Sequence, residues 1–314
     1  MNKIKKKLKA NNELIPIYIV MLIMIAINIW KQPTFFKPAT FARICNQLAP
    51  YIFMGMAQMC IMVLGGMDFG LGALVSLSTC IFATLMVENN TTNIFVIIGI
   101  ILMIGCIDAC VGYIVGRFNL PTIVVTLATS FVFEGLSLLI LPTPGGFINS
   151  AASKLFIGKL GIFPASLIWC AVFAAIWVIM RKSSVGLLIY ATGNNKKSAF
   201  TSGLNVKKGC VLAFFMSGIL AAMAGLMLCS RTMSGDPTIA NDLTINAVTA
   251  AVLGGVTFSG GEGKLAGVIA GSIVVGILVN VLFFLNITGF YTYFVQGIIL
   301  ILSVVVNNLR KRGK

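Results

Sequence analysis

Apolar and polar segments alternate along the whole chain. Apolar segments of about 17 residues or more recur from Leu14 to Val306, and a helix of that length crosses a hydrocarbon core of roughly 30 Å. Inside a bilayer the backbone must satisfy its own hydrogen bonds, so only helices and closed barrels span it. Segments such as 94–104 lack the alternation of apolar and polar positions that barrel strands show. The pattern therefore predicts an all-α, polytopic membrane protein.

About ten spans account for this pattern, with ends placed to within roughly four residues. They are expected near 14–30, 46–65, 70–87, 93–116, 121–141, 163–181, 209–230, 244–259, 265–285 and 289–307. The polar segments 142–163 and 182–208 are too short to be separate domains. We therefore expect residues 1–314 to form one transmembrane domain, with basic tails at 1–13 and 308–314.

Composition agrees with a membrane protein. Hydrophobic residues make up 58% of the 314, charged residues make up 10%, and the mean hydropathy is +1.01. A soluble domain carries about 25% charged residues, which it needs to cover its surface. The first apolar segment follows a lysine-rich tail, as in a signal peptide, but it ends in Trp30-Lys31-Gln32-Pro33 without a small-residue cleavage site. We expect it to be retained as the first span.

Charge placement predicts the orientation. Most Lys and Arg residues fall in the two tails and in alternate loops, and few fall in the loops between. Those expected inside are Lys3, Lys5, Lys6, Lys7, Lys9, Arg117, Arg181, Lys182, Lys196, Lys197, Lys207, Lys208, Lys264, Arg310, Lys311, Arg312 and Lys314. Basic residues favour the cytoplasmic side, so both termini are predicted to be cytoplasmic and the protein to lie in the plasma (inner) membrane. The net charge of +15 therefore indicates orientation and predicts no nucleic-acid partner, which would need a basic face on a folded domain.

The residue types that carry enzyme chemistry are scarce. The chain has no His, and its 8 Cys lie mostly in apolar segments without a CxxC pair. We therefore expect no metal site and no catalytic group. Gly260-Gly261-Glu262-Gly263-Lys264 lacks the spacing and the Ser or Thr of a phosphate-binding loop, so the chain is not expected to bind ATP by that route.

Two glycine-rich segments repeat one motif. Val63-Leu64-Gly65-Gly66 recurs as Val252-Leu253-Gly254-Gly255, each time where a span that enters the cell ends, and Asp68 follows the first copy. Glycines at such positions have two interpretations. They allow helices to pack closely in lipid, or they form the breaks that line or move the solute path in transporters built from repeats. We take Gly65, Gly66, Asp68, Gly254 and Gly255 as candidates for the second role.

Two acids, Asp108 and Glu134, fall within predicted spans. An acid in lipid costs at least several kcal/mol, so each is expected to face the bundle interior. They are candidate partners of one another or of nearby hydroxyl groups. An alternative function follows from them: an ion-coupled secondary carrier for a small polar solute, which would need no ATPase.

The loop 182–208 carries the most specific pattern. A short helix is expected at about 195–201, capped by Gly203. The segment resembles the cytoplasmic loop of ribose-type ABC importer permeases, which carries a pattern like G-x-N-x-x-A-A-x-x-S-G-I-x-V. The matching residues are Gly193, Asn195, Ala199, Ser202, Gly203 and Val206.

Three further blocks resemble the same family in the same order. Residues 64–72 are similar to its G-G-I-D-L-S-V-G, and residues 120–127 to its L-P-x-F-I-V-T-L. Residues 250–263 are similar to its A-A-V-V-L-G-G-x-x-x-x-G-G-x-G. Four blocks in order, over roughly 35–307, are far more specific than any one alone.

The resemblance implies a division of labour. Two permease subunits, identical or different, would form the pathway. A separate ATPase would hold ATP and Mg²⁺, so that this chain would need no cofactor. An extracytoplasmic binding protein would deliver a monosaccharide-like solute, and the loop 193–203 would couple the ATPase to the spans. The chain departs from the family at Asp108, at Glu134, where Arg is common, and at Lys196 and Lys197, where acids are common.

Overall fold

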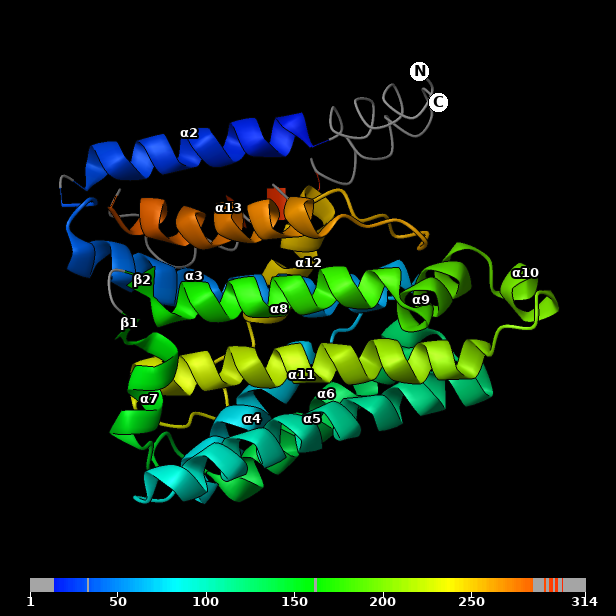
Figure 1. Ribbon diagram of the computed structural model, residues 1–314, viewed down its shortest axis with the longest axis horizontal. Helices are drawn as coiled ribbons and strands as arrows, with labels where there is room; N and C mark the ends of the chain where they lie inside the picture. Colours follow the sequence, from blue (N-terminus) through cyan, green and yellow to red (C-terminus); the bar gives the residue numbers. More distant parts are fainter. Residues whose placement is uncertain are drawn as a thin grey trace.

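The computed structural model describes residues 14–32, 34–160 and 163–284, together with helical positions 291, 294–295, 297–298 and 301. The long helices run side by side along one direction (Figure 1). The described helices, long and short, are α2 Ile15–Lys31, α3 Pro38–Val63, α4 Leu71–Leu85, α5 Asn90–Phe118, α6 Thr122–Ile140, α7 Ser150–Ile157, α8 Ala165–Lys182, α9 Ser184–Asn194, α10 Lys196–Thr201, α11 Val206–Thr232, α12 Leu243–Leu253 and α13 Leu265–Phe284. The two-residue strands β1 Lys159–Leu160 and β2 Phe163–Pro164 pair antiparallel.

The helical membrane architecture is confirmed. By length and composition α5, α6, α8, α11 and α13 are each able to cross a membrane, and α2, α4 and α12 are shorter apolar helices. Every predicted span from 14–30 to 265–285 coincides with one of the described helices. The last predicted span, 289–307, falls mostly on residues outside the described ones, so the number of ten spans stays a prediction.

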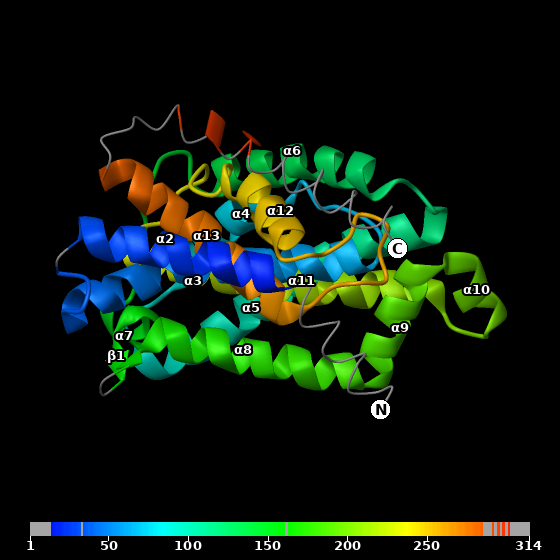
Figure 2. The same ribbon diagram turned by 90° about the horizontal axis from the view of Figure 1, so that it is seen from above.

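Helix α3 forms the centre of the bundle. Its C-terminal half is almost completely buried, with Phe53, Met56, Met59 and Ile61 at 0% exposure. It packs against α8, α11, α12 and α13. Because protein surrounds it on all sides, α3 carries Gln58 at 0% exposure within an otherwise apolar segment. By contrast, α6 and α8 expose many large apolar side chains and lie on opposite sides of the bundle, as Figure 2 shows.

Small residues bring α5 and α11 together over their whole length. A methyl group on Gly112 would lie 2.7 Å from Phe214 Cβ, and one on Gly218 would lie 2.7 Å from Asp108 Cβ. Without a hydrophobic driving force between helices in lipid, such close approach is what stabilises their association. The α5–α11 pair therefore forms one rigid side of the bundle.

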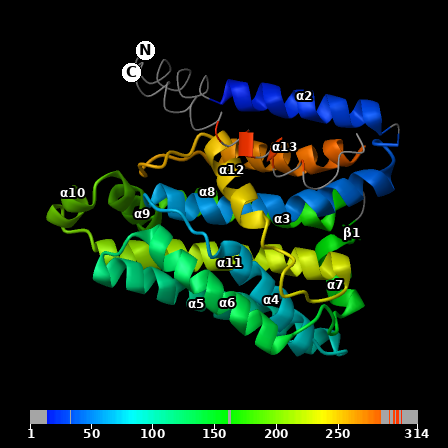
Figure 3. The ribbon, with the colours of Figure 1, turned by 180° about the vertical axis from the view of Figure 1, so that it is seen from behind.

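The structure differs from the predictions in local detail. Helix α12 ends at Leu253, not near 259, because Gly255 adopts a left-handed conformation with φ of 84° while the apolar sequence continues. The outer segment 142–163 contains the short helix α7 and the two-residue strand pair, which leave the helical class of the fold unchanged. The loop 182–208 contains two helices, α9 and α10, where one was expected. Figure 3 shows α12 as a short helix inclined to the long ones.

Candidate functional site

Three segments that lie far apart in the sequence meet at one end of α3. They are the loop 64–70 after α3, the loop 254–264 after α12, and the last turn of α9, 190–194; together we call them the glycine junction. The backbone N–H of Gly261 donates to the Val63 carbonyl at 2.8 Å, which joins the two loops. The first copy of the repeated motif is thus in direct contact with the loop that follows the second copy and with the loop expected to couple to an ATPase.

The junction depends on the absence of side chains at its centre. A methyl group on Gly193 would overlap the Val63 carbonyl oxygen. Gly260 has φ of 76°, and a methyl group there would lie 2.7 Å from the Gly193 carbonyl oxygen. Gly65 has φ of 89° and lies against the same segments. Gly260 combines a left-handed φ with close backbone approach, whereas Gly193 is required for the close approach and Gly65 is favoured by its left-handed φ.

Tyr190 fastens α9 to the junction through its hydroxyl group, which donates to the Gly263 carbonyl at 3.0 Å. Burial raises the pKa of Tyr190, and this outweighs the opposite effect of the nearby Arg181 guanidinium. The phenol therefore stays protonated and remains a donor. The Arg181 guanidinium lies over the Tyr190 ring, 5.1 Å from its centroid, and holds the ring in place.

We predict that Tyr190→Phe loosens α9 from the loop 254–264. The substitution removes only the hydroxyl group and keeps the ring on which Arg181 stacks. We expect a loss of about 1 kcal/mol of stability, the usual net contribution of one hydrogen bond. Thermal unfolding of the purified protein in detergent measures it. Tyr291→Phe, a change of the same chemistry on a ring that is 62% exposed, is the matched control, and an equal loss in both variants would contradict the assignment.

Helix α6 supports the first loop of the junction. Thr126 Oγ1 accepts a hydrogen bond from the Phe69 backbone N–H at 3.1 Å. A methyl group on Gly66 would lie 2.5 Å from Thr122 Oγ1, so the helix packs directly on the glycine. The block 120–127, like the other three blocks of the resemblance, therefore lies at this one site.

Asp68 holds the turn between α3 and α4. Its Oδ1 accepts from the Gly70 N–H at 2.7 Å, and the side chain is 2% exposed. In the amide orientation that satisfies both atoms, Gln58 of α3 donates to the Asp68 backbone carbonyl at 3.1 Å and accepts from its N–H at 3.2 Å. The contacts of Asp68 thus stabilise the loop, and its expected role in a moving pathway stays a prediction.

Asp108 lies in the interior, as expected, between α5 and α11. It is 1% exposed, and its Oδ2 has no hydrogen-bond partner among the described residues. Ser217 of α11 lies beside it, and the Asp68 carboxylate is close enough to interact with it electrostatically. Glu134 is only partly buried on α6 and makes no hydrogen bond to Asp108 in the described part of the chain. The proximity of Asp68 and Asp108 was not predicted.

We predict that Asp108→Asn raises the thermal stability of the protein. The substitution keeps the shape of the side chain and removes a buried ionisable group that has an unpaired oxygen among the described residues and a second carboxyl group nearby. The comparison is Asp68→Ala, which removes the acceptor for the buried Gly70 N–H and is expected to lower stability. Unfolding temperatures in detergent, measured side by side, check both. A lower value for Asp108→Asn than for the parent would contradict the prediction.

The expected helix of the cytoplasmic loop is present as α10. Asn195 caps its start, with Oδ1 accepting from the Ser198 N–H at 3.0 Å. Gly203 ends it with φ of 79°, and the Leu204 N–H donates back to the Ala199 carbonyl at 3.0 Å. Ala199 is buried at 4% exposure, which fixes the helix on its support. Helix α10 projects beyond the end of the bundle (Figure 1), and its main contacts are with α9 and α11.

Two features of the site could not be found by the sequence analysis. Tyr190 lies within the loop 182–208 but carries no local signal of its own. The Val63–Gly261 hydrogen bond joins residues from opposite ends of the chain. Only the repetition of the glycine motif indicated a relation between the two loops, without a contact.

The described helices define a multi-spanning membrane protein, and its relatives show that it is a transport permease. The chain belongs to the family described as branched-chain amino acid transport system, permease component, whose profile matches residues 40–304. It is 30% identical over 298 residues to the ribose import permease protein of Haemophilus influenzae. This alignment covers 93% of this chain and 92% of that protein. It is 26% identical over 318 residues to the galactose/methyl galactoside import permease protein of Escherichia coli, with 95% of each covered. No solved structure matches the chain.

These similarities decide between the two functions that the sequence left open. The prediction of an importer permease in the inner membrane is confirmed, and it is favoured over the ion-coupled carrier. The roles assigned to individual residues stay predictions.

Proposed function

We propose that this chain is the membrane-spanning subunit of a binding-protein-dependent ABC importer for a monosaccharide-like solute. The relatives described above are import permeases for ribose and for galactose or methyl galactoside, and a D-allose permease of Escherichia coli is 28% identical over 296 residues. The family description mentions branched-chain amino acids. We favour sugars because these relatives match over the whole length of the chain.

The observation that carries the proposal is the contact of the α9–α10 loop with both glycine-rich loops. Force applied to α10 reaches the ends of α3 and α12 through Gly193 and Tyr190, without an intervening flexible segment. A separate ATPase that holds ATP and Mg²⁺ would supply this force, with α10 and residues Gly193, Asn195, Ala199, Ser202 and Gly203 as its docking and coupling element. This chain itself would hydrolyse no ATP.

Three further features belong to the proposal. Ten spans would place both termini and the basic residues Lys196 and Lys197 in the cytoplasm, where these lysines would face acidic side chains of the ATPase. An extracytoplasmic binding protein would dock on the other side. A second permease, either identical or different, would complete the pathway between the two subunits, and residues 1–314 would form one domain in each.

Affinity purification of the tagged chain in mild detergent, followed by an ATPase assay, tests this proposal. We expect a co-purifying ATPase whose activity rises when a sugar-loaded binding protein is added. Ribose, galactose and allose are the first solutes to compare, with leucine, isoleucine and valine as the amino-acid alternative. A stable complex that contains only this chain, without ATPase activity, would contradict the proposal.

A further inference from the structure

A cavity lies at the elbow where α8 passes into α9. Helix α8 ends at Lys182, Ser183 is extended, and α9 begins at once at Ser184. The turn is tight because Gly186 approaches closely: a methyl group there would lie 2.5 Å from Arg181 Cα. The resulting cavity of about 390 Å³ is open to the outside and is lined by Arg181, Lys182, Ser183, Ser184, Gly186, Leu187 and Tyr190.

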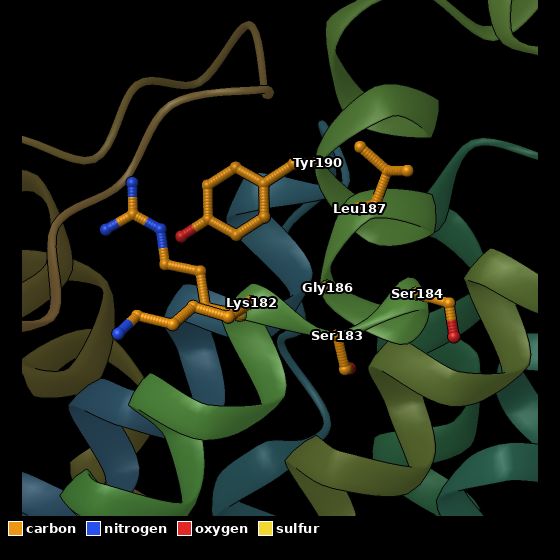
Figure 4. A pocket seen from close by; sticks show the side chains of 7 residues that line it. Lys182, Ser183, Ser184, Gly186, Leu187 and Tyr190 are labelled. Carbon is orange, nitrogen blue, oxygen red and sulfur yellow. The ribbon is translucent and has the colours of Figure 1, made fainter.

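The cavity carries positive charge for which the described residues provide no ion-pair partner. Arg181 and Lys182 form the last turn of α8, both are exposed, and neither has an ion-pair partner among the described residues. The residues of α8 and α9 include no acid. Figure 4 shows the side chains of Lys182 and Tyr190 extending to the same side of the elbow. Arg181 is held over the Tyr190 ring, so part of the basic surface is already positioned.

An exposed apolar surface continues from the basic cavity along α8. Ile168, Val172, Ile176 and Ile179 follow one another at helical spacing and are 36%, 41%, 42% and 70% exposed. Leu187, in the wall of the cavity, is 64% exposed. Helix α8 is long and apolar enough to cross a membrane, so this face meets lipid chains and the cavity lies at the level of the headgroups.

We propose that the elbow binds one anionic phospholipid. Its phosphate would lie against Arg181 and Lys182, on the side of the elbow where Tyr190 also lies, and one acyl chain would run along the exposed face of α8. A lipid fits better than an acidic protein surface, because the basic cavity and the apolar face are continuous on one helix. Its effect reaches the glycine junction, since the ring on which Arg181 stacks belongs to Tyr190, the residue bonded to Gly263.

Native mass spectrometry of the full chain in detergent, titrated with phosphatidylglycerol or phosphatidylcholine, tests this proposal. We expect phosphatidylglycerol to bind more tightly than phosphatidylcholine. The double variant Arg181→Gln/Lys182→Gln should bind phosphatidylglycerol roughly tenfold or more weakly. The control Lys207→Gln/Lys208→Gln removes the same charge at the end of another spanning helix, outside the cavity, and should change binding by less than about threefold. We call the double Gln variant the elbow variant. If it folds poorly, Arg181→Lys/Lys182→Arg is measured as well; this variant keeps both charges and should retain binding.

Two further measurements distinguish a bound phospholipid from a free phosphate ion and from a docked protein. Inorganic phosphate at the same concentrations should neither compete with phosphatidylglycerol nor stabilise the protein, because it lacks the acyl chain. Equal phosphatidylglycerol binding by the elbow variant and its parent would overturn the proposal, and so would competition by inorganic phosphate. An elbow variant that binds lipid normally but no longer co-purifies with an ATPase would assign the basic cavity to protein docking and also overturn it. None of these outcomes depends on whether the transported solute is a sugar.

Discussion

Gly193→Ala is expected to abolish ATP-driven uptake. The added methyl group would overlap the Val63 carbonyl group, and the Gly261 backbone nitrogen would lie at 3.0 Å. Both neighbours are backbone atoms, so no side chain can rotate away, and α9 must separate from the two glycine-rich loops. The Gly261 N–H to Val63 O hydrogen bond lies directly beside the overlap and is expected to break.

Uptake and thermal stability of this variant should be measured together with Gly135→Ala. A methyl group on Gly135 meets no atom within 4 Å, so the same change of residue on a spanning helix leaves the packing as it is. We expect Gly135→Ala to transport normally, and Gly193→Ala to lose at least roughly a hundredfold in uptake rate, which corresponds to about 2.7 kcal/mol. Normal uptake by Gly193→Ala would show that the junction need not be closed for transport.

Gly203→Pro is expected to stop ATP-driven uptake and leave membrane insertion intact. Proline fixes φ near −65° and has no N–H, whereas Gly203 has φ of 79° and donates to the Phe200 carbonyl at 3.0 Å. The end of α10 must therefore change its direction. Because α10 packs mainly against α9 and α11 and projects beyond the bundle, we expect the core of the bundle to keep its structure.

The control for this position is Gly203→Asn, since asparagine adopts the left-handed conformation more readily than other side chains and a side chain at Gly203 meets no atom within 4 Å. We expect Gly203→Asn to retain most of its uptake and Gly203→Pro to lose it, with equal amounts of both in the membrane. Stimulation of the co-purified ATPase by the binding protein is the second measurement. An uptake rate for Gly203→Pro close to that of the parent would remove the coupling role from α10.

Local signals allowed α10 to be predicted. Asn195 at its start and Gly203 at its end act through hydrogen bonds within a few residues, so the sequence contains all that is needed to place the helix. The same reasoning failed at the end of α12. Hydropathy continues through Val256 and Phe258, and only the left-handed φ of Gly255 ends the helix.

Contacts between distant segments could not be predicted. The repeated glycine motif suggested that the loops after α3 and α12 are related, but not that Val63 and Gly261 are bonded to each other. Apolar composition also did not distinguish α3, which protein surrounds, from α8, which exposes one apolar face on the outside of the bundle, because both environments favour the same residues. For Asp108, sequence reasoning considered Glu134 and nearby hydroxyl groups as partners, whereas the neighbours that the fold provides include Asp68, whose proximity depends on how α3 and α5 pack around α11.

Sugar uptake into proteoliposomes that contain the purified complex tests the central claim most directly. The complex is reconstituted with its binding protein, ATP is supplied or withheld, and an ionophore collapses all ion gradients in a parallel sample. The account predicts uptake that requires ATP, persists in the presence of ionophore, and disappears with Gly193→Ala. Uptake that proceeds without ATP and stops with the ionophore would contradict it.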